Sequence, residues 1–203
     1  MTCSITNDVK IYRGDPEPIS IGSYDVTKGL KAGKELGAAM AEGPGIYFTT
    51  NLHDARSYGK NITEFVVGKC SNIITDKSKK IGNNVINNII NSIDKETLEI
   101  ALSSWNENPT TARKMLLEEI SRTDNPQEQL INIWATVFYH QHPEKFIEVM
   151  IKNGIDGIKI KKEGHDHFII YNKKILKPVN QTINCSKEDK ICHRLNELMG
   201  AKI

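Results

Sequence analysis

The sequence predicts an α+β fold, in which strands come early and late in the chain and helices form the middle. Strand-like segments lie before about residue 75 and again after about residue 155, whereas apolar residues recur at helical spacing from about 83 to 153. Grouping strands and helices apart in this way favours α+β over a doubly wound α/β fold. No G-x-G-x-x-G or G-x-x-x-x-G-K-[ST] loop indicates the usual dinucleotide or phosphate sites.

The bulk composition fits a single domain of residues 1–203 that carries an insertion. The net charge of +2 does not favour nucleic acid as a partner, although it does not exclude it. No apolar run resembles a signal peptide or a membrane span, so we expect a cytoplasmic protein without a membrane partner, and delivery into a host cell without a classical signal peptide stays open. The cysteines fit no metal-binding spacing, and free thiols are the favoured interpretation: Cys3, Cys70, Cys185 and Cys192.

The first half of the chain is predicted to contain strands separated by two short helices. Residues 9–13 form the first predicted strand, and a short helix is expected over roughly 33–41. Residues 46–50 follow a Gly-Pro-Gly turn as the second strand. Asn51 is expected to cap a helix that ends at Gly59. Residues 63–75 form a strand or a strand pair.

The second half begins with the helical block of residues 83–153. Its apolar residues recur at helical spacing, as in Ile86, Ile89, Ile90 and Ile93. Strands return at 157–160 and 167–171 around a turn at 162–164, and 172–179 completes this pattern. The tail of about 180–203 contains a short amphipathic helix at 191–199.

Residues 43–59, GPGIYFTTNLHDARSYG, carry the first chemical signal. Tyr47 lies on the predicted strand, and Tyr58 lies near the end of the helix that follows. A strand that leads directly into a helix can bring two such rings together around a flat ligand ring. On spacing alone, two ordinary packing tyrosines are the favoured alternative.

This stretch resembles the poly(ADP-ribose) polymerase and diphtheria-toxin branch of the ADP-ribosyltransferases, including stand-alone bacterial or phage modules. The residues that carry the resemblance are Gly43, Gly45, Ile46, Tyr47, Phe48, Ala55 and Tyr58. The resemblance implies two small antiparallel sheets around an NAD crevice, with the helical block as an insertion. It also implies that Tyr47 and Tyr58 stack on the nicotinamide of NAD, and that Phe48 and Thr49 belong to the same cofactor-binding segment.

Two further segments resemble the same family in the same order. In residues 11–14, IYRG, the resemblance implies that Gly14 holds the nicotinamide amide through its backbone and that Arg13 binds the ribose or the pyrophosphate of NAD. A guanidinium fork suits a phosphate, although a surface arginine at a strand end is the ordinary alternative. Residues 155–158 and 167–172 resemble the last catalytic strand of the family.

His167 stands where the family has its catalytic glutamate. A neutral imidazole can accept a hydrogen bond, but it supplies no negative charge. Asp166 is expected to point to the opposite face of the strand. Asp54 is interpreted as an ordinary helix-start charge. The resemblance therefore implies that His167 and Tyr47 are the catalytic positions. We expect no metal, because the histidines fit no common zinc spacing.

These features predict an NAD-dependent ADP-ribosyltransferase, a glycosyltransferase for which NAD is the substrate. It would attach single ADP-ribose units to a macromolecular acceptor, in the first place a protein, and release nicotinamide. A toxin or effector role is compatible with this activity. Because the glutamate is replaced, the alternative is a catalytically inactive module that binds NAD or ADP-ribose or blocks a partner.

Overall fold

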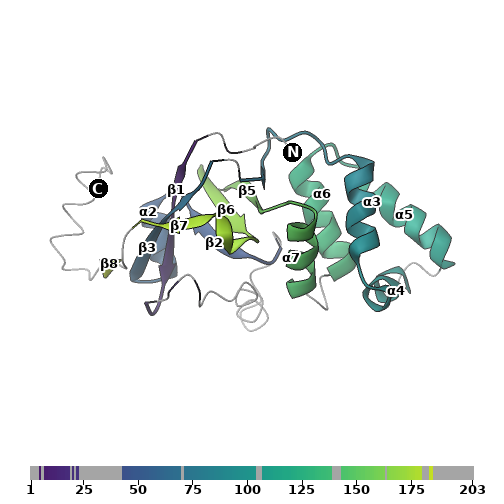
Figure 1. Cartoon of the computed structure of the whole chain (residues 1–203), viewed down its shortest axis with the longest axis horizontal. Helices are drawn as coiled ribbons and strands as arrows, with labels where there is room; N and C mark the ends of the chain where they lie inside the picture. The colour runs from purple at the N-terminus through teal and green to yellow at the C-terminus, as the bar shows by residue number, and fades with distance from the viewer. Residues whose placement is uncertain are drawn as a thin grey trace.

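The computed structural model describes residues 5, 7–18, 20, 22, 43–69, 71–103, 107–138, 143–162, 164–179 and 183–184. In Figure 1 the strands and one short helix occupy one half of the molecule, and the remaining helices occupy the other. The predicted α+β class is therefore confirmed. The helices expected at 33–41 and 191–199, and all four cysteines, lie outside the described residues.

The described strands form a mixed sheet in the order β4-β5-β6-β2-β1-β3-β7, and β8 also pairs with β3. All its pairings are antiparallel except β4 with β5. The strands are β1 (Val9–Asp15), β2 (Ile46–Thr49), β3 (Asn61–Val67), β4 (Ile73–Ile74), β5 (Gly157–Lys162), β6 (His165–Ile170), β7 (Leu176–Pro178) and β8 (Ile183–Asn184).

The sheet is split between β1 and β2. Every residue of β1 has a partner on β3, and every residue of β2 has one on β6, but β1 and β2 share the single pair Tyr12 with Thr49. Past this pair, no register pair joins residues 13–15 to residues 46–48. The expectation of two separate antiparallel sheets is therefore wrong: the pair Tyr12–Thr49 joins the two halves into one sheet, and the parallel strand β4 makes it mixed.

Side-chain caps explain where several helices begin. The side chains of Asn51, Asn108 and Asn125 accept hydrogen bonds from the first backbone N–H groups of α2, α5 and α6, as the N-cap preference predicts. The helices are α2 (Leu52–Tyr58), α3 (Asn83–Ser92), α4 (Lys95–Ser103), α5 (Pro109–Ser121), α6 (Pro126–Ile133), the π-helical turn η2 (Trp134–Phe138), α7 (Pro143–Lys152) and the 3-10 turn η3 (Lys173–Ile175).

The helical block, α3 to α7, shares its core with the sheet. Ile86, Ile89 and Ile90 of α3 are fully buried in a cluster that also contains Ile158 of β5 and Ile169 of β6. A second cluster, which includes Phe48 and Phe65, lies on the other face of β2. Strand residues alternate between the two faces, so one half of the sheet separates the two clusters. The helical block therefore packs directly onto this half of the sheet.

Asp156 fixes the beginning of β5. Its carboxylate accepts hydrogen bonds from the backbone N–H of Asn72, at 2.8 Å, and from the side-chain amide of Asn172, at 2.7 Å. Its backbone carbonyl accepts from the N–H groups of Tyr171 and Asn172. The Asp-Gly pair at 156–157 thus ties β4, β5 and the end of β6 together, which is a structural role.

Candidate functional site

The three segments that carry the family resemblance are neighbours in the sheet. Strand β2 lies between β1, which contains Arg13 and Gly14, and β6, which contains His167. These strands are far apart in the sequence, so their pairing is a tertiary feature. The candidate site is therefore the region around the split between β1 and β2, together with the adjoining part of β6.

One face of β2 brings three of the predicted residues together. Tyr47 pairs with Ile169, and Thr49 pairs with His167, in the antiparallel register of β2 and β6. Directly opposed residues project from the same face, so Tyr47, Thr49 and His167 share a face. Phe48 projects from the other face, where it is buried edge-on against Phe65 with ring centroids 5.3 Å apart. The Phe48 side chain is thus part of the core.

Helix α2 covers the same face of β1. Gly14 approaches the helix so closely that an added Cβ would lie 1.9 Å from the carbonyl oxygen of Ala55. Tyr12, Ala55 and Ile62 form a small buried cluster here. Burial raises the pKa of the Tyr12 hydroxyl, and nearby Glu64 adds to this effect. The glycine is therefore required by the close packing of α2.

Asp54 in the first turn of α2 reaches His167. Its Oδ2 atom lies 3.1 Å from Nε2 of His167, and the two side chains are 23% and 10% exposed. The interpretation of Asp54 as an ordinary helix-start charge does not include this contact. The sequence predicts that the cap at Asn51 places Asp54 in the first turn of the helix after β2. It does not predict that this turn lies beside His167, because that depends on the register between β2 and β6.

Asn51 connects the start of α2 to β6. Its Oδ1 atom accepts from the N–H groups of His53, at 2.8 Å, and Asp54, at 3.3 Å. Its Nδ2 atom lies 2.8 Å from Nε2 of His165. His165 pairs with Lys162 at the hairpin end of β6, two residues before His167. The cap therefore fixes Asp54 relative to the strand that carries His167.

Arg13 spans the split. Its Nε donates to Oδ1 of Asp15 at 3.1 Å, and its Nη1 donates to the carbonyl oxygen of Tyr47 at 3.0 Å. Asp15 is only 3% exposed, so this carboxylate needs such a cationic partner. In this arrangement the guanidinium links β1 to β2 where their backbones are no longer paired.

The two tyrosines lie on β2 and at the end of α2. The Tyr47 hydroxyl donates to the carbonyl of Gly43, and its ring packs against the core of the helical block. Tyr58 ends α2 and is 61% exposed, and the following Gly59 lies against the backbone of Asp15. The Tyr58 side chain is thus accessible from solvent.

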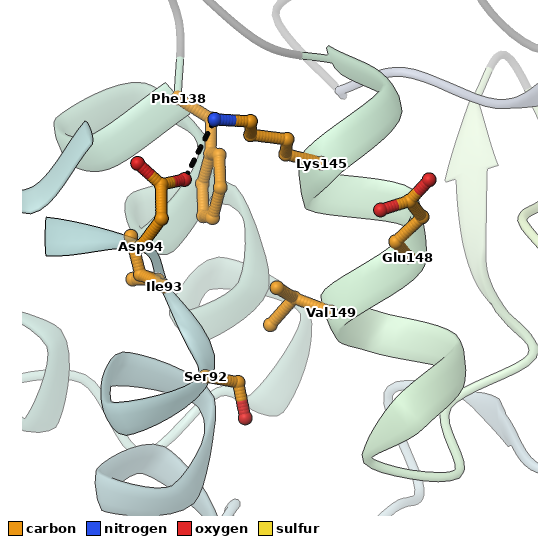
Figure 2. A pocket seen from close by; sticks show the side chains of 7 residues that line it. All are labelled: Ser92, Ile93, Asp94, Phe138, Lys145, Glu148 and Val149. Atoms are coloured by element: carbon orange, nitrogen blue, oxygen red, sulfur yellow. Dashed lines mark hydrogen bonds and ion pairs between the residues drawn. The ribbon is translucent and has the colours of Figure 1, made fainter. Parts of the chain in front are cut away.

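A separate hollow of about 260 Å³ lies in the helical block. Figure 2 shows Lys145 of α7 reaching toward Asp94, with Phe138 beside them. The Lys145 Nζ lies 2.7 Å from Oδ2 of Asp94, and Asp94 also accepts from the backbone N–H of Thr97 at the start of α4. These hydrogen bonds, chiefly that of Lys145, hold the pKa of the Asp94 carboxyl well below its ordinary value.

The replacement Asp94→Asn is expected to lower stability slightly at pH 7, because asparagine can keep the cap but loses the attraction to Lys145. The pKa of Asp94 is lower in the folded state, so its stabilisation is complete above its unfolded pKa of about 3.9 and is lost as the pH falls further. Urea unfolding of both proteins from pH 7 to pH 2 measures this difference. A difference that does not shrink below pH 4 would contradict the assignment.

Within the described part of the chain, no group of three histidine, cysteine, aspartate or glutamate side chains is arranged to hold a metal ion. Among the described helices, none is long and apolar enough to cross a membrane. His140 and His142 lie outside the described residues.

No family model and no curated protein sequence matches the chain. Among solved structures, the chain is similar to one described as "Crystal structure of an anti-CRISPR protein". The two share 11% sequence identity with a TM-score of 0.36, and the similarity covers 89% of this chain and 99% of that one. A similarity this distant does not establish a shared fold or function.

Proposed function

We propose that this protein is an NAD-dependent ADP-ribosyltransferase that transfers ADP-ribose to a macromolecular acceptor and releases nicotinamide. The observation that carries the proposal is the meeting of β1, β2 and β6, with Tyr47, Thr49 and His167 on one face beside the split. Fold-level resemblance alone does not establish an activity, whereas this group of residues can be tested one by one.

In this proposal, the split between β1 and β2 is the NAD crevice of an ADP-ribosyltransferase fold. No register pair joins residues 13–15 to β2, and the nicotinamide amide would bind at Gly14 beside this split. Tyr47 and the exposed Tyr58 would stack on the nicotinamide ring. Arg13 already bonds Asp15 and Tyr47, so it would bind the ribose or pyrophosphate from this bridging position.

The proposal also covers the acceptor, the site of action and the biological role. We expect a protein acceptor, a cytoplasmic site of action and a role as a toxin or effector. A binding module without activity is the second candidate, because His167 supplies no negative charge where the family has a glutamate. The contact with Asp54 favours the enzyme over this candidate, since it brings a carboxylate within 3.1 Å of His167.

Tyr47→Ala is expected to weaken NAD binding about 10- to 100-fold, because losing the buried ring surface and its stacking costs on the order of 1.5–3 kcal/mol. Calorimetry measures the affinity, and nicotinamide release from NAD, with and without cell lysate, measures turnover. His167→Ala is expected to abolish release while NAD binding persists. His53→Ala, which removes an exposed histidine of α2, is the matched control and should release nicotinamide like the wild type.

Two results would decide against this proposal. Unchanged NAD affinity and turnover in Tyr47→Ala would show that the site lies elsewhere. Saturable NAD binding by the wild type without any nicotinamide release, with or without lysate, would favour the non-catalytic module.

A further inference from the structure

The contact between Asp54 and His167 favours one tautomer of the imidazole. Oδ2 of Asp54 is buried and accepts no hydrogen bond within the described part of the chain, and it lies 3.1 Å from Nε2 of His167. A carboxylate can only accept hydrogen bonds, and a neutral imidazole donates from one nitrogen and accepts at the other. A proton on Nε2 would give this buried oxygen the donor that it lacks, and Nδ1 would then keep its lone pair.

Nδ1 of His167 has no hydrogen-bond partner among the described residues, so its lone pair is not used within that part of the chain. The imidazole is held from two directions. Its strand pairs Thr49 with His167, and the cap at Asn51 bonds both Asp54 and His165. A histidine fixed by a carboxylate at one nitrogen, with a lone pair at the other, has the arrangement of a general base.

We propose, on the basis of the ADP-ribosyl transfer proposed above, that His167 is the general base for the acceptor and that Asp54 positions it. The acceptor nucleophile is then a neutral hydroxyl of a protein serine or threonine. A carboxylate acceptor is already deprotonated and needs no base, and an arginine guanidinium keeps its proton too strongly for an imidazole to remove it.

The step balances without any further reactant. The acceptor oxygen forms a bond to C1′ of the NAD ribose, and the bond from C1′ to the nicotinamide nitrogen breaks. Nicotinamide leaves as a neutral molecule with the bonding electron pair. The hydroxyl proton passes to Nδ1 of His167, and the Asp54 carboxylate stabilises the resulting imidazolium.

Asp54 also supplies the negative charge that the glutamate of the family would provide at this position. A neutral His167 together with an ionised Asp54 has a net charge of −1 beside a ribose that develops positive charge. Without Asp54, the protonated imidazole would leave a second positive charge uncompensated at the same place. An anionic side chain close to a developing cation lowers its energy most where water is excluded, and His167 is only 8% exposed.

Asp54→Asn is the decisive variant, because it keeps the size of the side chain and removes its charge. The matched control is Asp166→Asn. Asp166 precedes His167 on β6, projects from the opposite face and forms an ion pair with Lys159. We expect Asp54→Asn to slow transfer to lysate proteins from labelled NAD by about 10²- to 10⁴-fold, the usual contribution of general-base catalysis. The KM for NAD of Asp54→Asn should change little, and Asp166→Asn should transfer ADP-ribose at nearly the wild-type rate.

Two further measurements test the pair and the acceptor separately. Long-range ¹H–¹⁵N correlation on the full-length protein, with the His167 signals assigned from a His167→Gln variant, should show a proton on Nε2 in the wild type. This preference should weaken in Asp54→Asn. The ADP-ribose attached to lysate proteins should resist neutral hydroxylamine, which cleaves carboxylate esters.

Each contrary outcome overturns a different part. A proton on Nδ1 of His167 in the wild type contradicts the pair, whatever the activity. Unchanged transfer by a folded Asp54→Asn contradicts the positioning role, and linkages labile to hydroxylamine contradict the hydroxyl acceptor. Absence of nicotinamide release from the wild type, with the proton on Nε2, contradicts the proposed function and the base role but leaves the observed contact intact.

Discussion

Gly14→Ala is expected to destabilise the protein by about 3 kcal/mol, at the upper end of the cost of overpacking. The new Cβ would lie 1.9 Å from the carbonyl oxygen of Ala55 and 2.9 Å from that of Gly59. Both atoms belong to the backbone of α2 or of the residue that ends it, so no side chain can rotate away. Helix α2 would have to move off β1, and Asp54 would move with it away from His167.

Urea unfolding measures the stability of Gly14→Ala, and nicotinamide release measures whether displacing α2 also abolishes turnover. Gly82→Ala is the matched control, because an added Cβ there meets no atom within 4 Å and the backbone is extended. We expect its free energy of unfolding to stay within about 0.5 kcal/mol of the wild type. Equal stability of the two variants would show that α2 does not pack on Gly14 as described.

Phe146→Ala is expected to destabilise the protein by about 3–5 kcal/mol, the usual cost of removing a large core aromatic side chain. Phe146 is 1% exposed and makes edge contacts with three rings, each with its centroid 5.5 Å away: Trp134, Phe138 and Tyr171. Such pairs stabilise by about 0.5–1.5 kcal/mol beyond area burial. Tyr171 directly follows β6, so this cluster connects the helical block to the sheet.

Thermal and urea unfolding of Phe146→Ala should give a single transition at a lower midpoint, since the helical block and the sheet share one core. Ile100→Ala, which shortens a side chain of α4 that is 44% exposed, is the control and should change stability little. Two separate transitions in the variant would contradict this view, because the block would then unfold independently of the sheet.

The α+β class and several local elements could be predicted from the sequence because they depend on near neighbours. The cap at Asn51, the end of its helix at Gly59 and the buried isoleucines of α3 all follow from short-range rules, and the structure confirms them. For residues 63–75 the sequence predicts a strand or a strand pair, and the structure has two strands there, β3 and the short β4. Strand β6 begins at His165, two residues before the predicted 167, because a turn at Gly164 with φ of 85° lets the hairpin continue.

The number of sheets could not be predicted in the same way. Hydrogen bonding between strands depends on which edges meet, and periodicity within a strand does not specify its neighbour. A single residue pair, Tyr12 with Thr49, decides between two sheets and one split sheet.

The sequence by itself determined the α+β class and the approximate places of its main strands, and it placed Tyr47, Arg13, Gly14 and His167 on three separate strands. Only the tertiary structure decided that β2 lies between β1 and β6, and that Thr49 pairs with His167. This register, together with the cap that starts α2, brings Asp54 against His167. Local spacing fixes the direction of a side chain along its own element, whereas strand pairing across more than a hundred residues fixes what that side chain meets.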